Sequence, residues 1–312
     1  MDFQPRHQRH GPPRDSRFYQ SPDAGVDASS READMTTVQI LCDNNIGRMD
    51  FLGEHGFAAF IEHDGQTFLF DSGQGHTLPH NVQSGGIQLK DIAVILISHG
   101  HFDHTGGLAW VLAQTGPKKI IAHPSIFARH MARLSPDPAV APRFIGPPQS
   151  REELEAAGAE FEFREETGPI APGFHFLTGY ARHPDKTPGD RQLVLAQGEE
   201  LVPDPIAEDA NLLLETASGP VLVLGCAHGG VLNILDHVRE KFGIDRLHAV
   251  LGGTHLMFYA PEQIQKVIAA FEAFKVEMVG VSHCTGPQAG MTLARHFGER
   301  FRQASAGSRF EF

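Results

Sequence analysis

An uninterrupted apolar run at residues 92–97, IAVILI, passes directly into the segment SHGHFDH at residues 98–104. A short continuous run rich in isoleucine and valine predicts a strand that is buried on both faces. Where this strand should end, the chain places three histidines and one aspartate. Sheet folds carry their chemistry where strands end in loops, so the segment predicts both a sheet core and a site at its edge.

Short apolar runs of the same kind recur from residue 36 onward, bounded by glycine, aspartate and asparagine. Their length and their valine, isoleucine and phenylalanine content favour strands, and stretches with helical spacing separate them. Two such halves predict an α/β protein with two mixed sheets packed face to face and helices outside. The strands are expected within residues 37–43, 56–65, 67–73, 92–100, 118–124, 159–163, 174–179, 191–197, 211–216, 220–228, 247–253 and 276–284, and the helices within 105–116, 151–158, 229–243, 260–275 and 286–301.

The composition is that of a soluble globular protein, with 312 residues, 41% of them hydrophobic, and a formal net charge of -12. Residues 1–34 are rich in proline, arginine, aspartate and serine and have almost no aliphatic side chains. Such a segment cannot bury enough surface to order itself, so we expect a disordered tail followed by one folded domain over residues 35–312. Met35 is a candidate alternative start.

Several missing features narrow the function. No stretch approaches the roughly 20 apolar residues of a membrane span, and no secretory signal is recognisable at the N-terminus. Three cysteines are too few for a disulfide framework and suit a reducing compartment, so we expect a cytoplasmic protein. The acidic balance and the lack of a lysine and arginine run disfavour a nucleic-acid partner. A small-molecule substrate is the better prediction, and the oligomeric state is left open.

The spacing within residues 99–104 suits metal ions better than surface histidines. His99 and His101 lie two apart in extended chain, so their imidazoles project to the same side and can share one ion. Asp103 and His104 follow where the chain turns into a helix, which directs them toward a second ion about 3.5 to 4 Å from the first. Solvated or satisfied core histidines are the common alternative. Four ligand-type side chains on one strand end disfavour that alternative.

The segment SHGHFDH resembles the His-x-His-x-Asp-His signature of the metallo-β-lactamase superfamily. LFDSG is similar to the superfamily's early strand motif, in which the aspartate, here Asp71, supports a metal-binding histidine. GCAHGGVLNIL, LGGTHL and VSHCTG resemble a narrower family, the dihydropterin-methyl ribofuranosylaminobenzene phosphate synthases and their uncharacterised bacterial relatives. The resemblance covers most of residues 36–286. It implies a four-layer αββα sandwich with two divalent metal ions, zinc in the first place and manganese or iron as alternatives.

The resemblance also implies six metal ligands. Four of them lie in the segment at residues 98–104. Another follows the apolar run that ends at residue 282, where the superfamily places its last histidine ligand, and one more lies two residues past Cys226. The implied sets are His99, His101 and His228 for one ion and Asp103, His104 and His283 for the other.

Two departures from the superfamily pattern leave the bridging ligand open. Many members have a Gly-Asp pair whose aspartate bridges the metals, but the equivalent pair here is Gly225–Cys226. The stretch that matches an upstream histidine motif reads AEDANLLLE, with Glu208 and Asp209 in its place. Cys226 suits a thiolate ligand and a buried packing residue equally well, and Asp209 is a candidate supporting residue.

His255, in LGGTHL, follows another predicted strand and is expected at the same site. It could bind substrate, transfer a proton or cap a loop, and we take it with Asp103 as a candidate catalytic residue. The helix that starts in HGGVLNIL is expected to offer free backbone N–H groups to a phosphate of an anionic substrate. Arg182 and Lys186 could meet the same substrate, although solvated loop charge is the simpler interpretation of them and of neighbouring His183.

The sequence therefore predicts a dinuclear hydrolase that uses a metal-activated water, or a transferase like the narrower family that acts on a phosphorylated small molecule. Lactone or thioester hydrolysis and phosphodiester cleavage are alternatives on the same fold. A non-catalytic metal-dependent sensor or binding protein is a further alternative, which the complete ligand set disfavours. A flavodiiron-type redox protein is disfavoured because the chain has no room for a flavodoxin-like module.

Overall fold

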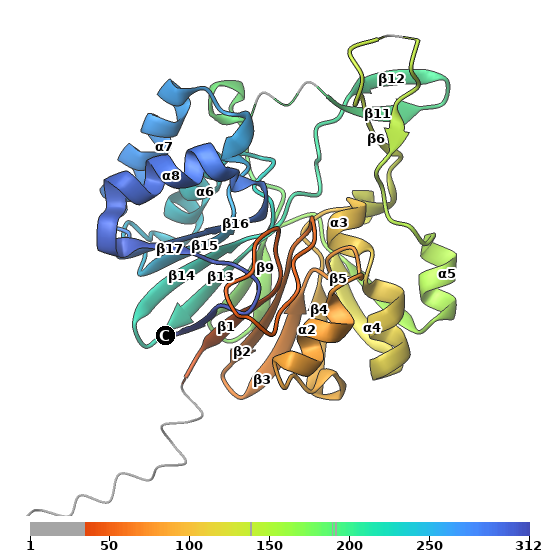
Figure 1. Cartoon of the computed structure of the whole chain (residues 1–312), viewed down its shortest axis with the longest axis horizontal. Coiled ribbons are helices and arrows are strands. Elements are labelled where there is room, and N and C mark those ends of the chain that lie inside the picture. Colours follow the sequence, from red (N-terminus) through yellow and green to blue (C-terminus); the bar gives the residue numbers. More distant parts are fainter. Residues whose placement is uncertain (1–34, 138, 189, 191) are drawn as a thin grey trace, which may run out of the picture.

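The computed structural model describes residues 35–137, 139–188, 190 and 192–312, and two large sheets face each other within it (Figure 1). The expected N-terminal tail, residues 1–34, lies outside the described residues. The first sheet has the order β18 (Arg309–Glu311), β1 (Thr37–Cys42), β2 (Ala58–His63), β3 (Gln66–Phe70), β4 (Ile92–Leu96), β5 (Lys118–Ala122) and β8 (Ala159–Phe163). The second has the order β17 (Phe301–Gln303), β16 (Met278–Ser282), β15 (Ala249–Gly253), β14 (Gly219–Leu224), β13 (Asn211–Thr216), β10 (Phe174–Leu177) and β9 (Gly168–Ala171).

Each sheet combines antiparallel and parallel strands. In the first sheet β3, β4, β5 and β8 are parallel, and in the second β14, β15, β16 and β17 are parallel. The remaining neighbours pair in antiparallel fashion, including β18 with β1, which brings the end of the chain beside the first strand. Parallel strands end at a common edge, so the loops after β3 and β4 and those after β14, β15 and β16 each start from one edge of their sheet.

Side chains from both sheets form the central core. Phe68 and Phe70 of β3 point into it from one side, and Phe174 and Phe176 of β10 from the other. The rings of Phe68 and Phe174 meet edge to face at 4.8 Å. Leu69 points the opposite way, into a second core beneath the helices. Burial on both faces explains why these strands read as continuous apolar runs, and each fully buried side chain of this size stabilises the fold by about 1.5 to 3 kcal/mol.

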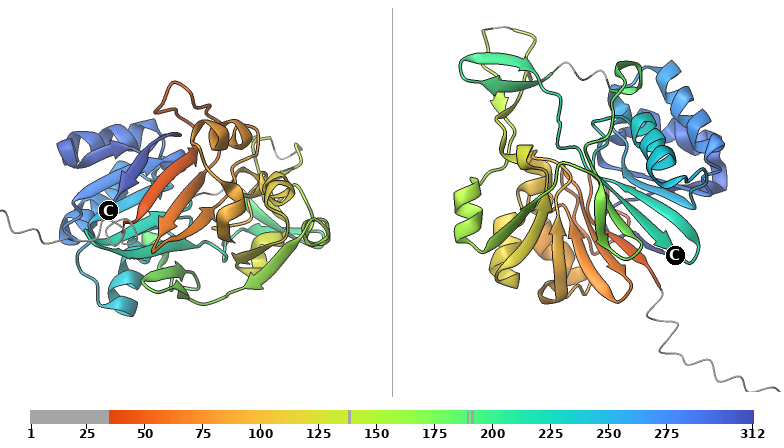
Figure 2. Two further views of the ribbon diagram at one scale, coloured as in Figure 1. Left: turned by 90° about the horizontal axis from the view of Figure 1, so that it is seen from below. Right: turned by 180° about the vertical axis from the view of Figure 1, so that it is seen from behind.

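Helices cover the outer face of each sheet, which confirms the predicted four-layer arrangement (Figure 2). The helices α2 (Leu78–Ser84), α4 (Leu108–Thr115) and α5 (Arg151–Ala156) pack on the first sheet, and α6 (Val231–Phe242), α7 (Pro261–Ala273) and α8 (Pro287–Phe297) pack on the second. The short α3 (Phe102–Thr105) follows β4, and 3₁₀ turns occur at Leu89–Asp91, Pro124–Phe127, Pro184–Lys186, Leu256–Phe258, His283–Thr285 and Gly298–Arg300. Within the described ranges, no helix combines the length and the apolar character that crossing a bilayer requires.

A third, small sheet was not predicted. It has the order β12 (Glu200–Pro203), β11 (Leu193–Gln197), β6 (His130–Ala132) and β7 (Arg143–Phe144), and it projects from the sandwich at the upper right of Figure 1. The sequence indicated only the strand that became β11. The strands β6 and β7 have three and two residues, too few for an alternating pattern to show.

The loops that leave the parallel strands contain strained backbone. The φ values of Asp71, Ala227, His255 and His283 are 59°, 52°, 54° and 50°. These values lie in the left-handed region, which residues other than glycine rarely adopt. Each such residue costs about 1 to 2 kcal/mol, so the conformation persists only where surrounding contacts hold it. Backbone strain of this kind concentrates at functional sites, so these four loops are candidates for the site.

Candidate metal centre

The histidines expected on the first ion come together where β4 and β14 end. His99 Nε2 lies 2.9 Å from His101 Nδ1 and 3.2 Å from His228 Nε2, and the three donor atoms lie within 4.8 Å of one another. All three side chains are buried. A neutral imidazole has one donor and one acceptor nitrogen, so three facing nitrogens cannot all be satisfied by hydrogen bonds to each other. A cation among them would use all three lone pairs, so the group fits a metal ion.

These three histidines are held in the neutral form that binds metals. Burial lowers the pKa of His99 and of His228 well below the ordinary histidine range, and neighbouring imidazoles lower it further. Burial also lowers the pKa of His101 to about 4, although the negative charge of Asp103 opposes the shift. A neutral imidazole keeps the lone pair that a metal requires.

The residues expected on the second ion form a neighbouring group. His283 Nε2 lies 3.3 Å from Asp103 Oδ2 and 3.1 Å from His104 Nε2, and the Asp103 and His104 atoms are 3.8 Å apart. Burial raises the pKa of Asp103, but the imidazoles of His104 and His283 outweigh burial and hold it well below its usual value. Burial lowers the pKa of His283, but negative charge on Cys284 and Asp103 raises it to about 9. The ionised carboxylate therefore favours a positive charge beside it. A proton on an imidazole supplies such a charge, and a metal ion between the donors would supply it too.

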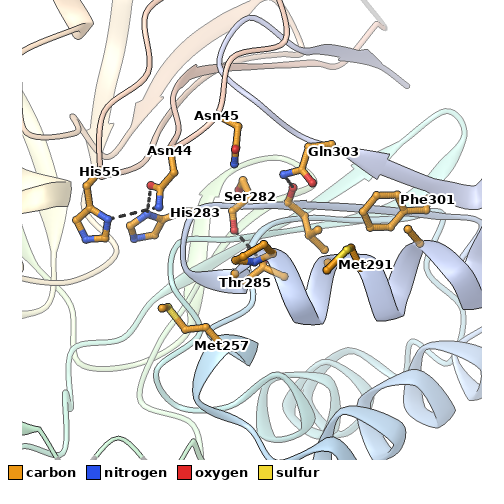
Figure 3. A pocket seen from close by; sticks show the side chains of 15 residues that line it. Asn44, Asn45, His55, Met257, Ser282, His283, Thr285, Met291, Phe301 and Gln303 are labelled. Carbon is orange, nitrogen blue, oxygen red and sulfur yellow. Dashed lines mark hydrogen bonds between the residues drawn. The ribbon is translucent and has the colours of Figure 1, made fainter.

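Hydrogen-bonding contacts orient both histidines of this second group. Asp71 Oδ2 lies 2.7 Å from His104 Nδ1, and the Asp71 carboxylate also accepts from Ser98 N at 2.7 Å and Ser98 Oγ at 2.6 Å. On the other side, His283 Nδ1 donates to Asn44 Oδ1 at 3.1 Å (Figure 3). Because the Nδ1 atom of each ring is engaged in this way, its Nε2 atom points toward the other donor atoms of the second group. Ser98 and Asn44 were not predicted.

The two groups lie side by side. The rings of His99 and His104, one from each group, have centroids 4.1 Å apart. Cys226 Sγ lies within 4.8 Å of a donor atom of both histidines. Six nitrogen and oxygen donors in two adjacent groups, with a thiol beside both, form a site suited to one or two transition-metal ions.

Comparison with known proteins bears on this site directly. A family model described as the metallo-beta-lactamase superfamily matches residues 53–231, more than half of the chain and including the segment at 98–104. The chain belongs to the metallo-β-lactamase superfamily. A likeness of the whole fold agrees with this: the solved structure of Tm1679, a metal-dependent hydrolase of the β-lactamase superfamily, superposes with a TM-score of 0.76 at 27% identity and covers 89% of this chain and 99% of that one.

Three further proteins are similar to this chain over most of their own length. The 7,8-dihydropterin-6-methyl-4-(β-D-ribofuranosyl)-aminobenzene-5'-phosphate synthase of Methanocaldococcus jannaschii is 28% identical over 272 residues, which are 84% of this chain and 91% of that protein. The uncharacterised protein MJ0448 of the same organism is 28% identical over 260 residues, 83% of this chain and 94% of its own. Zinc-bound PqqB of Methylobacterium extorquens shares the fold, with a TM-score of 0.54 at 12% identity over 88% of this chain and 99% of its own.

The residues directly before α6 limit the phosphate seat that we expected there. His228 N donates to Asp209 Oδ1 at 3.0 Å, Gly229 N donates to Asp209 Oδ2 at 3.0 Å, and Gly230 N donates to Ala227 O. These three N–H groups are therefore not free for an anion. The Asp209 carboxylate also accepts from Tyr180 Oη. Asp209 therefore fixes the backbone of His228 and does not face the donor groups.

His255 lies in the wall of the site, as expected from its place after β15. Its ring packs against that of His228 with centroids 4.1 Å apart, and its Nδ1 lies 3.5 Å from Cys226 Sγ. Its Nε2 is buried, has no hydrogen-bond partner within the part of the chain that is described, and lies 3.7 Å from Asp190 Oδ2. Burial lowers the pKa of His255, but Asp190 and the negative charge on Cys284 raise it to about 9. A charged imidazolium is thus available beside the donor groups at neutral pH.

A cavity of about 260 Å³ opens over both donor groups. One wall comes from the small sheet and its loops, and the wall includes Arg143, whose guanidinium lies over the ring of Phe102. Half-exposed His55, which was not predicted, lies with Nε2 3.2 Å from Asp103 Oδ2. A second cavity of about 440 Å³ adjoins the first and shares His55, His283 and Met257 with it (Figure 3).

The loop cations that could have met an anionic substrate lie elsewhere. Arg182 donates to the carbonyl oxygens of Pro205 and Ala207, and Lys186 pairs with Asp236 at 2.5 Å. Neither residue lines the two cavities beside the donor groups. Loop charge is therefore the right interpretation of both residues, and Arg143 is an arginine that the fold does bring to the wall of the cavity.

Proposed function

We propose that this chain is a metal-dependent enzyme of the metallo-β-lactamase superfamily that holds two divalent ions and acts on a phosphorylated small molecule. The observation that carries the proposal is the pair of buried three-donor groups where loops of the two sheets meet, with neighbouring nitrogen or oxygen atoms 2.9 to 3.8 Å apart. In this proposal one ion is held by His99, His101 and His228 and the other by Asp103, His104 and His283.

Two ions bound there would supply Lewis acidity, which lowers the pKa of water and neutralises negative charge as it develops on oxygen. Zinc is the first expectation, and manganese or iron suit the same histidine and carboxylate donors. The chain itself holds the donors in place: Asp71 fixes the ring of His104, and Asp209 fixes the backbone of His228. Such supporting contacts remove the cost of organising the ligands when the ions bind.

The relative named as a synthase supports a transferase reaction. In that reaction an arylamine nitrogen attacks a pterin-methyl carbon, the carbon–oxygen bond to a diphosphate breaks, and the amine loses a proton. In this proposal the ionised Asp103 accepts that proton. His255, whose pKa is raised to about 9, donates a hydrogen bond to the departing phosphate oxygen. Arg143 at the cavity mouth offers a further positive charge to the anionic end of the substrate.

The first experiment is elemental analysis of metal in the purified chain, in Asp103→Ala and in His228→Ala. His76→Ala is the matched control, because His76 is exposed and outside both groups. We expect about two ions per chain in the parent and the control, with fewer in both variants. Absence of metal after reconstitution with zinc, manganese or iron would contradict the proposal.

A second experiment separates the reaction types. Metal-loaded protein is given a pterin-methyl diphosphate with an arylamine ribotide, and in parallel a lactone, a thioester and a phosphodiester. Release of pyrophosphate that depends on the arylamine supports the transferase. Hydrolysis of the lactone, the thioester or the phosphodiester, without any need for the arylamine, would replace the proposed transferase by a hydrolase of the same fold. Metal binding without turnover of any of them would favour a sensor or binding protein.

A further inference from the structure

Two thiols meet in the wall of the cavity. Cys226 follows β14 and Cys284 follows β16, and their sulfur atoms lie 3.0 Å apart across the end of β15. Both are free cysteines with 3% and 4% of their surface exposed. A disulfide bond is about 2.05 Å long, so the two sulfur atoms need to approach by only about 1 Å to bond.

A glycine makes this approach possible. A Cβ atom on Gly253, the last residue of β15, would lie 2.9 Å from Cys284 Sγ and 3.3 Å from Cys226 Cα. Any larger residue at this position would therefore push into the space where the two cysteines meet. The third cysteine, Cys42, has a different environment, since its sulfur contacts Thr77 Oγ1 at 3.7 Å.

Neighbouring atoms fix the positions of the two sulfurs. The backbone N–H of His255 donates to Cys284 Sγ at 3.2 Å, and the Cys284 thiol contacts the carbonyl oxygen of Cys226 at 3.3 Å. Both cysteines line the 260 Å³ cavity over the donor groups. A small oxidant that enters the cavity can therefore reach a pair of thiols that is already aligned.

We propose that Cys226 and Cys284 form a redox pair that a hydroperoxide oxidises to a reversible intramolecular disulfide. The sulfur of Cys284 attacks a peroxide oxygen, the oxygen–oxygen bond breaks, and a sulfenic acid and one water form from hydrogen peroxide. The sulfur of Cys226 then attacks the sulfenic sulfur, the sulfur–oxygen bond breaks, and a second water leaves. In sum, two thiols and one hydrogen peroxide give one disulfide and two waters.

The pair stands beside the donor groups but its oxidation does not depend on the proposed function. Cys226 Sγ lies within 4.8 Å of donor atoms of His99 and His104, so a bond to Cys284 changes the surroundings of both. A small dithiol reductant reverses the change by thiol–disulfide exchange. The structure thus assigns a modification site to the wall of the cavity.

The test treats the purified full chain with one equivalent of hydrogen peroxide, both as isolated and after metal removal. Thiols are counted under denaturing conditions, and disulfides are mapped by mass spectrometry of unreduced peptides. We expect the loss of two of the three thiols, a peptide pair that joins Cys226 to Cys284, and full recovery with dithiothreitol. Retention of all three thiols in both preparations overturns the proposal, as does oxygen addition without a disulfide or pairing with Cys42.

Two variants complete the test. Cys42→Ala is the matched control, since Cys42 is also buried, and it should still lose two thiols. Cys284→Ala should form no intramolecular disulfide. If Cys284→Ala does not fold, the peptide map of the parent chain decides the question alone. Formation of an intramolecular disulfide in Cys284→Ala would overturn the assignment of the pair.

Discussion

Asp71 Oδ2 lies 2.7 Å from His104 Nδ1, and both side chains are completely buried. The contact determines which nitrogen of His104 faces His283, 179 positions further along the chain. The backbone of Asp71 adopts a strained φ of 59°. Hydrogen bonds from Ser98 N and Ser98 Oγ hold the Asp71 carboxylate in position. The fold therefore orients a candidate ligand through a buried carboxylate that does not line either cavity.

Replacing Asp71 by asparagine should weaken metal binding. An amide in this position either presents its NH₂ group to His104 Nδ1 or loses the hydrogen bonds from Ser98, and in both cases the His104 ring loses its fixed orientation. We expect the affinity of the chain for zinc to fall by about 10- to 100-fold, measured by competition with a chromogenic chelator. Asp245→Asn is the control, because Asp245 is exposed, and it should leave the affinity for zinc unchanged. An unchanged zinc affinity in Asp71→Asn would show that His104 is oriented without this carboxylate.

Asp209 gives a second prediction, on stability. Its carboxylate accepts two backbone N–H groups at the start of α6 and the hydroxyl of Tyr180, all in the interior. Asp209→Asn replaces one accepting oxygen by a donor and leaves a buried N–H unpaired, so the free energy of unfolding should fall by about 1 to 3 kcal/mol. Urea denaturation measures this loss. Asp236→Asn, which removes only a surface partner of Lys186, should cost less than about 1 kcal/mol, and equal losses would contradict the interpretation.

The pair formed by His130 and Asp204 predicts a dependence on pH. Burial lowers the pKa of His130, but hydrogen bonds to Asp204 and Glu208 outweigh it and raise the pKa to about 10; His130 Nδ1 lies 2.6 Å from Asp204 Oδ2. Because the folded pKa lies above the ordinary value of about 6.5, the stabilisation is complete below about pH 6.5 and is lost as the pH rises toward about 10.

Asp204→Asn should therefore destabilise the chain most near neutral or mildly acidic pH. We expect a loss of about 2 to 3 kcal/mol in the free energy of unfolding near pH 6, which shrinks as the pH approaches about 10. Urea denaturation across this range, with exposed Asp185→Asn as the control, makes the comparison. A loss that is the same at every pH would mean that the charge on His130 does not carry it.

Arg143 yields a prediction about ligand binding. Its side chain lines the 260 Å³ cavity, and the residue lies on the small sheet. If an anionic group of the substrate binds there, Arg143→Ala should weaken binding of pyrophosphate to the metal-loaded chain by about fivefold, measured by calorimetry. Arg182→Ala, whose guanidinium bonds to loop carbonyls, should leave that affinity unchanged. Equal affinities for the parent and Arg143→Ala would place the anion elsewhere.

The sandwich could be predicted because its signals are local. Strand β4 is a continuous apolar run, and the outer helices α6 and α8 each show helical periodicity and end at a glycine. The small sheet could not be predicted, because β6 and β7 depend on cross-strand partners rather than on their own residues. The pairing of β18 with β1 is equally invisible, since it joins segments from opposite ends of the folded region.

The candidate site divides in the same way. Four donors could be found from one segment because the extended chain after β4 and the helical turn of α3 set their relative directions. His55 and Ser98 could not be found, since neither lies in a pattern that separates it from other surface or loop residues. The contacts before α6 could not be predicted either, because the carboxylate of Asp209, in the loop before β13, reaches His228 N and Gly229 N only in the folded chain.

By itself, then, the sequence determined the alternation of buried strands and amphipathic helices, the position of the ligand-rich strand end, and membership of a superfamily. These depend on periodicity and spacing within short stretches, where the covalent chain sets the geometry. Only the tertiary structure decided which residues complete each donor group, where the cation at the mouth comes from, and that Cys226 and Cys284 touch. Those contacts join segments 58 to 179 positions apart, and packing of the two sheets, not local conformation, brings them within bonding distance.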